Sequence, residues 1–126
     1  MLRNEKGFTL IEIIAVLIIL GILAAVAIPR YFSLQEKAAD KVAEATLSSA
    51  YSALSIGWAA YKMNSANAPN TPADACAGVS GIGAPNTVTA LSCGAGAWPS
   101  SGGNVSVTVT YSGGTNTTLS GLWTVP

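Results

Sequence analysis

Glu12 is the residue of this sequence whose position most needs a chemical explanation. It lies in an apolar segment: the run from Ile13 to Ile28 is wholly apolar, and Phe8 extends it toward the N-terminus. As a helix this segment would be about 30 Å long, the thickness of the hydrocarbon core of a bilayer. An unpaired carboxylate at that depth costs on the order of a few kcal/mol or more. We therefore expect Glu12 to have a charged partner; the alternatives are that it takes up a proton or reaches the lipid headgroups.

Cys76 and Cys93 are the only two cysteines, and they lie close together in the charge-poor half of the chain. A cysteine pair in a small exported domain is typical of one disulfide. For a loop of this length, such a cross-link stabilises the folded state by about 3 kcal/mol. The apolar N-terminal segment implies export of the residues that follow it, and this favours the disulfide. The alternative is two free buried thiols in a reducing compartment.

The sequence lacks the residue patterns that most enzymes and metal sites use. It contains no histidine, which excludes histidine-based triads and histidine metal ligands. Two cysteines at this spacing form no zinc motif, and no glycine-rich phosphate loop follows a strand. Beyond Lys62 the only charged side chain is Asp74, and the formal net charge is zero. We therefore predict a protein that is not an enzyme, binds no cofactor or metal, and has no nucleic-acid surface.

One helix of about residues 8–63 is expected to carry the apolar segment. Gly21 and Pro29 both weaken a helix, so we expect a kink near residues 25–29. Beyond Pro29 the pattern becomes amphipathic, with one apolar stripe at helical spacing formed by Leu47, Tyr51, Leu54, Trp58 and Tyr61. Such a helix would be about 80 Å long. A small head cannot cover it, so its exposed apolar half must find lipid or other copies of the chain.

Residues 64–126 are expected to form a small head. Proline and asparagine predict a loop from Asn64 to Ala75, and glycine predicts more loop between the cysteines. Three short strands are predicted at residues 87–91, 104–111 and 117–125, the second with strict alternation of apolar and hydroxyl side chains. The resulting α+β architecture places an antiparallel sheet on the apolar stripe of the helix, because each supplies an apolar face that the other lacks. The aromatic side chains are expected in this core: Trp58, Tyr61, Trp98 and Trp123.

The segment KGFTLIEIIAVLIILGILAAVAIPRY resembles the N-terminus of type IV pilins and of their relatives, the pseudopilins of type II secretion. The resemblance implies that a prepilin peptidase cuts between Gly7 and Phe8, and that the new amine of Phe8 is methylated. It also implies that Glu12 pairs with the amine of a neighbouring subunit during assembly. Gly21 and Pro29 correspond to the positions where the family's helix loosens and bends, and the segment between them would extend locally in a filament.

The resemblance implies a pilin fold with a division of the chain into a leader (1–7), a transmembrane and filament-core helix (8–29), an amphipathic helix (30–63) and a β-rich head with one disulfide loop (64–126). It implies a homopolymeric filament outside the cell. The precursor would wait in the inner membrane with its N-terminus in the cytoplasm, and its partners would be the prepilin peptidase and the pilus assembly machinery. The continuation PRYFSLQEKA is loosely similar to mannose-sensitive haemagglutinin pilins.

Two other interpretations remain open at this point. The first is a pseudopilin or a minor pilin with the same anchor. Asp74 has no acidic neighbours for the calcium site of the major pseudopilins, and this difference favours a pilin. The second is a single-span membrane protein whose head binds a ligand, against which the order of Gly7, Phe8 and Glu12 speaks.

Overall fold

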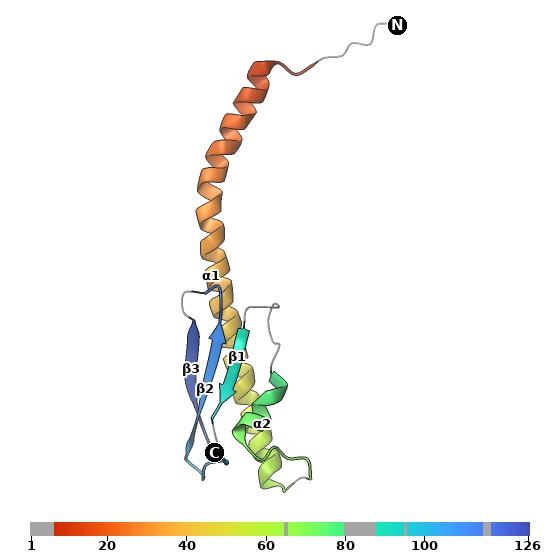
Figure 1. Ribbon diagram of the computed structural model, residues 1–126, viewed down its shortest axis with the longest axis vertical. Coiled ribbons are helices and arrows are strands. Elements are labelled where there is room, and N and C mark those ends of the chain that lie inside the picture. Colours follow the sequence, from red (N-terminus) through yellow and green to blue (C-terminus); the bar gives the residue numbers. More distant parts are fainter. Residues whose placement is uncertain (1–6, 65, 80–87, 95, 115–116) are drawn as a thin grey trace, which may run out of the picture. The chain divides into compact units, whose positions relative to one another are not determined.

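The computed structural model describes residues 7–64, 66–79, 88–94, 96–114 and 117–126 (Figure 1). The chain divides into two compact units, Met1–Leu34 and Gln35–Pro126. The predicted α+β class, with a long N-terminal helix and a small antiparallel sheet, is confirmed. The elements in chain order are α1 (Leu10–Lys62), α2 (Pro72–Cys76), the 3-10 helix η1 (Ala77–Val79), β1 (Val88–Cys93), β2 (Asn104–Tyr111) and β3 (Thr118–Thr124).

The first unit contains the apolar part of α1. The helix continues through Gly21 and through Pro29, which lies inside it. Every residue from Gly7 to Leu34 is exposed in the single chain. A β-carbon added at Gly21 would meet no atom within 4 Å. The single chain therefore keeps both helix-weakening residues in helical conformation, and local extension between them stays a prediction about the assembled state.

The second part of α1 supplies one wall of the head core. Leu54 is completely buried and Trp58 nearly so, as the predicted stripe requires. Tyr61, also predicted in the stripe, is 43% exposed, because it lies beside the Trp58 ring at the end of the core. The buried face also begins earlier than the stripe, at small residues that pattern reading passed over: Ala39, Ala43, Thr46 and Ala50.

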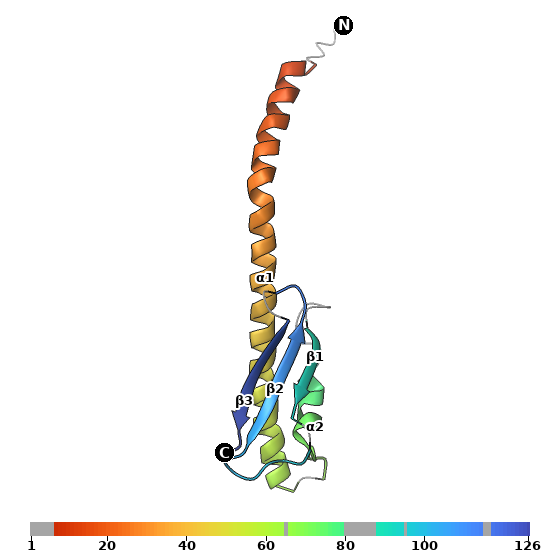
Figure 2. The ribbon, with the colours of Figure 1, turned by 60° about the vertical axis from the view of Figure 1, so that its left-hand side comes forward.

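The sheet has the order β1-β2-β3 with both pairs antiparallel, so β2 is central (Figure 2). The predicted alternation in β2 is confirmed, since Val105, Val107, Val109 and Tyr111 are buried. Val107 packs in a cluster with α1 residues that include Leu54, and Val109 packs in a second cluster with Ala39 and Ala43. The sheet therefore covers the amphipathic part of α1 as expected.

The prediction of an uninterrupted loop from Asn64 to Ala75 is wrong, because this segment contains the start of α2. Thr71 caps the helix: its Oγ1 accepts a hydrogen bond from Asp74 N at 3.1 Å, and the Asp74 carboxylate accepts one from Thr71 N at 3.1 Å. Pro72 fits at the first helical position, where its missing N–H is not needed. Thr71-Pro72-Ala73-Asp74 is thus a helix-start signal, overridden in the sequence reading by the prolines and asparagines around it.

The disulfide between Cys76 and Cys93 is present, with a Cα–Cα distance of 6.2 Å. It joins the end of α2 to the end of β1, and both cysteines are buried. Three indoles lie beside it in the same core, those of Trp58, Trp98 and Trp123. The Trp98 indole N–H donates a hydrogen bond to Pro69 O at 2.9 Å, so this polar group of the core has a partner.

Candidate functional site: the N-terminal segment

The first turn of α1 supplies a partner for Glu12 from its own chain. The Glu12 carboxylate accepts hydrogen bonds from the backbone N and the hydroxyl of Thr9, both at 2.7 Å, and Glu12 N lies 3.4 Å from the Thr9 hydroxyl. This reciprocal arrangement is a capping box, which satisfies N–H groups that have no acceptor in the first turn of a helix. Sequence reasoning sought the partner of Glu12 outside the segment and missed Thr9. The signal was there, since T-L-I-E has the capping-box spacing.

The Gly7–Phe8 bond lies outside the helix: α1 begins at Leu10, and Thr9 separates it from this bond. Gly7 and Phe8 are both exposed, and Phe8 is 82% exposed. A backbone free of helical hydrogen bonds in an exposed position can enter a peptidase site without unfolding the helix that follows. A cut here would place the new amine of Phe8 one helical turn before Glu12. The expected leader, residues 1–7, lies outside the described residues except for Gly7.

The apolar helix leaves large side chains without contacts in the single chain. Its exposed fractions include 61% for Leu17, 63% for Ile22 and 59% for Val26. Soluble monomers rarely expose contiguous apolar surface of this extent. The helix is long and apolar enough to span a membrane. Its surroundings must therefore be apolar, either lipid tails or equivalent helices.

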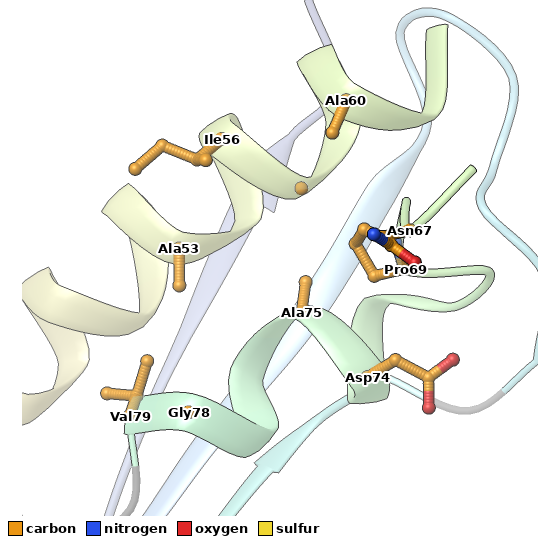
Figure 3. A pocket seen from close by; sticks show the side chains of 10 residues that line it. Ala53, Ile56, Ala60, Asn67, Pro69, Asp74, Ala75, Gly78 and Val79 are labelled. Atoms are coloured by element: carbon orange, nitrogen blue, oxygen red, sulfur yellow. The ribbon is translucent and has the colours of Figure 1, made fainter. Parts of the chain in front are cut away.

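The head has a shallow apolar groove between α1 and the α2–η1 segment (Figure 3). The carboxylate of Asp74 lies at its rim and is held by Thr71 in the cap of α2. Few polar groups converge on the groove, whereas ligand sites usually combine an apolar wall with placed polar groups. Its lining consists of Ala53, Ile56, Gly57, Ala60, Asn67, Pro69, Asp74, Ala75, Gly78 and Val79. In the part of the chain that the structure describes, no three metal-ligating side chains cluster.

Comparison with known protein families gives a match that covers this N-terminal segment. Residues 2–28 match the family model of the prokaryotic N-terminal methylation motif. This match contains Gly7, Phe8, Glu12 and Gly21, whereas Pro29 lies just beyond it. The chain thus carries a prepilin-type N-terminus on a pilin-like α+β architecture.

The chain is similar to subunits of two kinds of assembly. It is 39% identical over 69 residues to the type II secretion system core protein G of Pseudomonas aeruginosa, covering 55% of this chain and 46% of that protein. It is 43% identical over 53 residues to the major component of the narrow type IV pilus of Thermus thermophilus, covering 42% and 46%. It is 49% identical over 49 residues to the major component of that organism's wide pilus, covering 39% and 37%.

The chain spans less than half the length of these three relatives. No solved structure is significantly similar to it. The family model itself covers residues 2–28 of the chain.

Proposed function

We propose that the protein is the structural subunit, in the major-pilin role, of a bacterial type IV pilus that polymerises through its N-terminal helix. The observation that carries this proposal is the apolar part of α1, which lies largely within the methylation motif and is exposed along the described residues of its unit. The head buries only the later part of α1. Packing many copies side by side would remove the exposed apolar surface from water and supply the stabilisation of the filament.

Processing would change the surroundings of Glu12. Cleavage after Gly7 creates a positively charged amine on Phe8, which is then methylated. In the apolar core of a filament, Glu12 would pair with the amine of a neighbouring subunit, because an unpaired buried charge costs more than a paired one. A misregistered subunit would leave both charges unpaired. Thr9 would hold the carboxylate until a neighbour arrives.

Gly21 and Pro29 fit a helix that must remain intact in the membrane and loosen during assembly. Glycine adds backbone freedom, and proline removes one backbone donor from the helix. In the single chain both lie in helix. We propose that the segment between them extends when subunits pack, after the precursor has waited in the inner membrane with its N-terminus in the cytoplasm.

A second candidate function is that of a pseudopilin in a type II secretion system, or of a minor pilin. The observation that favours it is the longer alignment with core protein G, which covers 55% of this chain against 42% for the narrow-pilus component. Both candidates use the same anchor and processing. They differ in whether the filament leaves the cell envelope.

The intact mass of the protein in filaments sheared from the cell surface tests the proposal. We expect a mass that lacks residues 1–7, carries one added methyl group and has lost two hydrogens to the disulfide. A full-length mass found only in membranes would overturn the pilin role. A processed mass confined to the cell envelope would favour the secretion pseudopilin.

Substitution of Glu12 tests the pairing. We expect Glu12→Val to leave membrane insertion and cleavage intact but to reduce surface filaments to a small fraction of wild type, measured by shearing and quantitative immunoblotting. Glu36→Val is the matched control, because Glu36 is an exposed glutamate of the same helix outside the apolar run. Normal filament yield from the Glu12→Val protein would contradict the pairing role.

A further inference from the structure

Among the strands that the structure describes, β3 is paired on one side only, with β2, and its other side is an edge of the sheet. Trp123 pairs with Val105 in the register of β2 and β3. Beyond the two ends of β3, Val125 N donates to Gly103 O at 2.8 Å and Tyr111 N donates to Thr117 O at 2.9 Å. These two bonds show which residues of the ladder form hydrogen-bonded pairs. Bonded pairs alternate along an antiparallel ladder, so the odd-numbered residues of β3 bond to β2. The N–H and C=O groups of its even-numbered residues point to the outer edge: Thr118, Ser120, Leu122 and Thr124.

The two edges of the sheet differ in what lies beside them. β1 lies next to α2, to which the disulfide joins it. β2 lies on one side of β3, and in Figure 1 no other drawn helix or strand of the head lies on its other side. β3 therefore has an open edge along its length.

β3 carries none of the devices that usually protect an edge strand. Its sequence, TLSGLWT, contains no charge and no proline, and its ladder with β2 runs without a bulge from Thr118 to Thr124. Leu122 is 66% exposed on the outer face. The outward neighbours on β2 are also uncharged, with hydroxyls at Ser106 and Thr108. Neither electrostatic repulsion nor a missing donor within the strand opposes the addition of another strand.

We infer that β3 pairs antiparallel with β3 of a second copy of this chain, forming a continuous six-stranded sheet. An open strand edge binds an extended strand through backbone hydrogen bonds, and an uncharged edge fits an uncharged one. Pairing about Gly121 sets Thr118 opposite Thr124 and Ser120 opposite Leu122, so the outward backbone groups of both copies are satisfied together. Gly121 lies at the centre of this pairing, on the face of the sheet toward α1, where a β-carbon would collide with the hydroxyl of Tyr51 in its own chain.

The symmetry of this contact decides which copies it joins. The same strand is used on both sides, so the two copies are related by a two-fold axis. Successive subunits of a polar filament are not related in this way. If the proposed function holds, on which this step rests, the contact therefore joins subunits of two neighbouring filaments.

Amide hydrogen exchange of the purified full-length protein in detergent tests the pairing without needing filaments. As protein concentration rises, we expect exchange at Leu122 and Thr124 to slow at least about tenfold, while Val107 in central β2 stays unchanged. Ser120→Pro removes one outward donor without touching the ladder to β2, so it should abolish the slowing. Ser120→Ala keeps the donor and should behave as wild type.

Two results would overturn the inference. One is exchange at Leu122 that is independent of concentration in the wild-type protein. The other is a Ser120→Pro protein that slows as much as Ser120→Ala. If Ser120→Pro loses protection at Val107 and so fails to fold, Leu122→Lys takes its place, because two lysines near the shared axis repel each other. Concentration-dependent slowing that survives in Leu122→Lys would then count against the contact.

Electron microscopy of sheared filaments extends the test to the assembled state. We expect wild-type and Ser120→Ala filaments to bundle and Ser120→Pro filaments to remain single at equal yield. Equal bundling in all three would contradict the role between filaments. A complete lack of wild-type filaments would instead count against the proposed function, and the exchange result on β3 would be unaffected.

Discussion

The two parts of α1 both carry large apolar side chains, but these differ in burial. Leu20 in the first part is 55% exposed, whereas Leu54 in the second is fully buried under the sheet. Gly21 has open space around it, whereas a β-carbon at Gly57 would lie 2.6 Å from that of Ala75. The comparison shows that an apolar helix is stabilised within this chain only where the head covers it. The uncovered part depends on other molecules.

The largest difference between the two parts is expected from the same substitution made in each. Leu54→Ala should lower the free energy of unfolding of the head by about 3 kcal/mol, because it leaves a cavity in a close-packed core. Leu20→Ala should leave it unchanged, since Leu20 has no core to disrupt. Urea unfolding of the full-length protein in detergent, followed by tryptophan fluorescence, measures the head alone, because all three tryptophans lie in its core.

Equal destabilisation by the two leucine variants would refute the division of the helix into a covered and an uncovered part. Filament yield provides the opposite readout. On the proposed function, Leu20→Ala should weaken filaments although the isolated subunit keeps its stability.

Removal of the disulfide should have the next largest effect, again confined to the head. The double variant Cys76→Ser with Cys93→Ser should lose about 3 kcal/mol of stability, since the unfolded chain is no longer cross-linked. Helix content of the first unit should not change, because that unit holds no cysteine. Urea unfolding and far-ultraviolet circular dichroism measure the two effects, and the reduced wild-type protein is the control. An unchanged unfolding midpoint would show that the cross-link contributes nothing.

Replacing each of the two helix glycines by alanine should have a smaller effect, destabilising the head at Gly57 and stabilising the helix at Gly21. Gly57→Ala should destabilise the head by about 1–3 kcal/mol, because the new methyl group meets Ala75 and Pro69. Gly21→Ala should raise the helicity of the first unit, since alanine is the better helix former by about 1 kcal/mol. Thermal unfolding measures the stability of the Gly57→Ala head, and circular dichroism measures the helicity of the Gly21→Ala protein. A Gly57→Ala protein as stable as wild type would show that α2 can move away from α1 at little cost.

The smallest effect is a pH dependence of the head at alkaline pH. Burial, together with the hydrogen bond that the Tyr111 hydroxyl donates to Asp40 at 2.9 Å, raises the pKa of Tyr111 above its ordinary value of 10.0. The folded state thus holds this proton more tightly than the unfolded state. Its contribution is complete below about pH 10 and is lost as pH rises through the folded pKa. Urea unfolding between pH 9 and about 11.5 should show a fall that Tyr111→Phe reduces; identical slopes would contradict the assignment.

Most of the fold could be predicted because its signals are periodic. The alternation in β2 and the end of α1 near Met63 both follow from local pattern, and Asn64 ends the helix with a φ of 52°. Two capping boxes were missed, at Thr9–Glu12 and Thr71–Asp74. Each spans only four residues. The first was outweighed by the expectation of a charged partner for Glu12, and the second by the expectation of a loop.

The sequence by itself determined the class of the protein, because the length of the apolar run, the methylation motif and the strand alternation are local properties of the chain. Only the tertiary structure decided which part of α1 is buried, which glycine is tightly packed and which strand edge remains open. These depend on contacts between residues far apart in sequence, such as Trp123 with Ser55 and Tyr111 with Asp40. Pattern shows that a residue needs a partner, but packing decides which one it has.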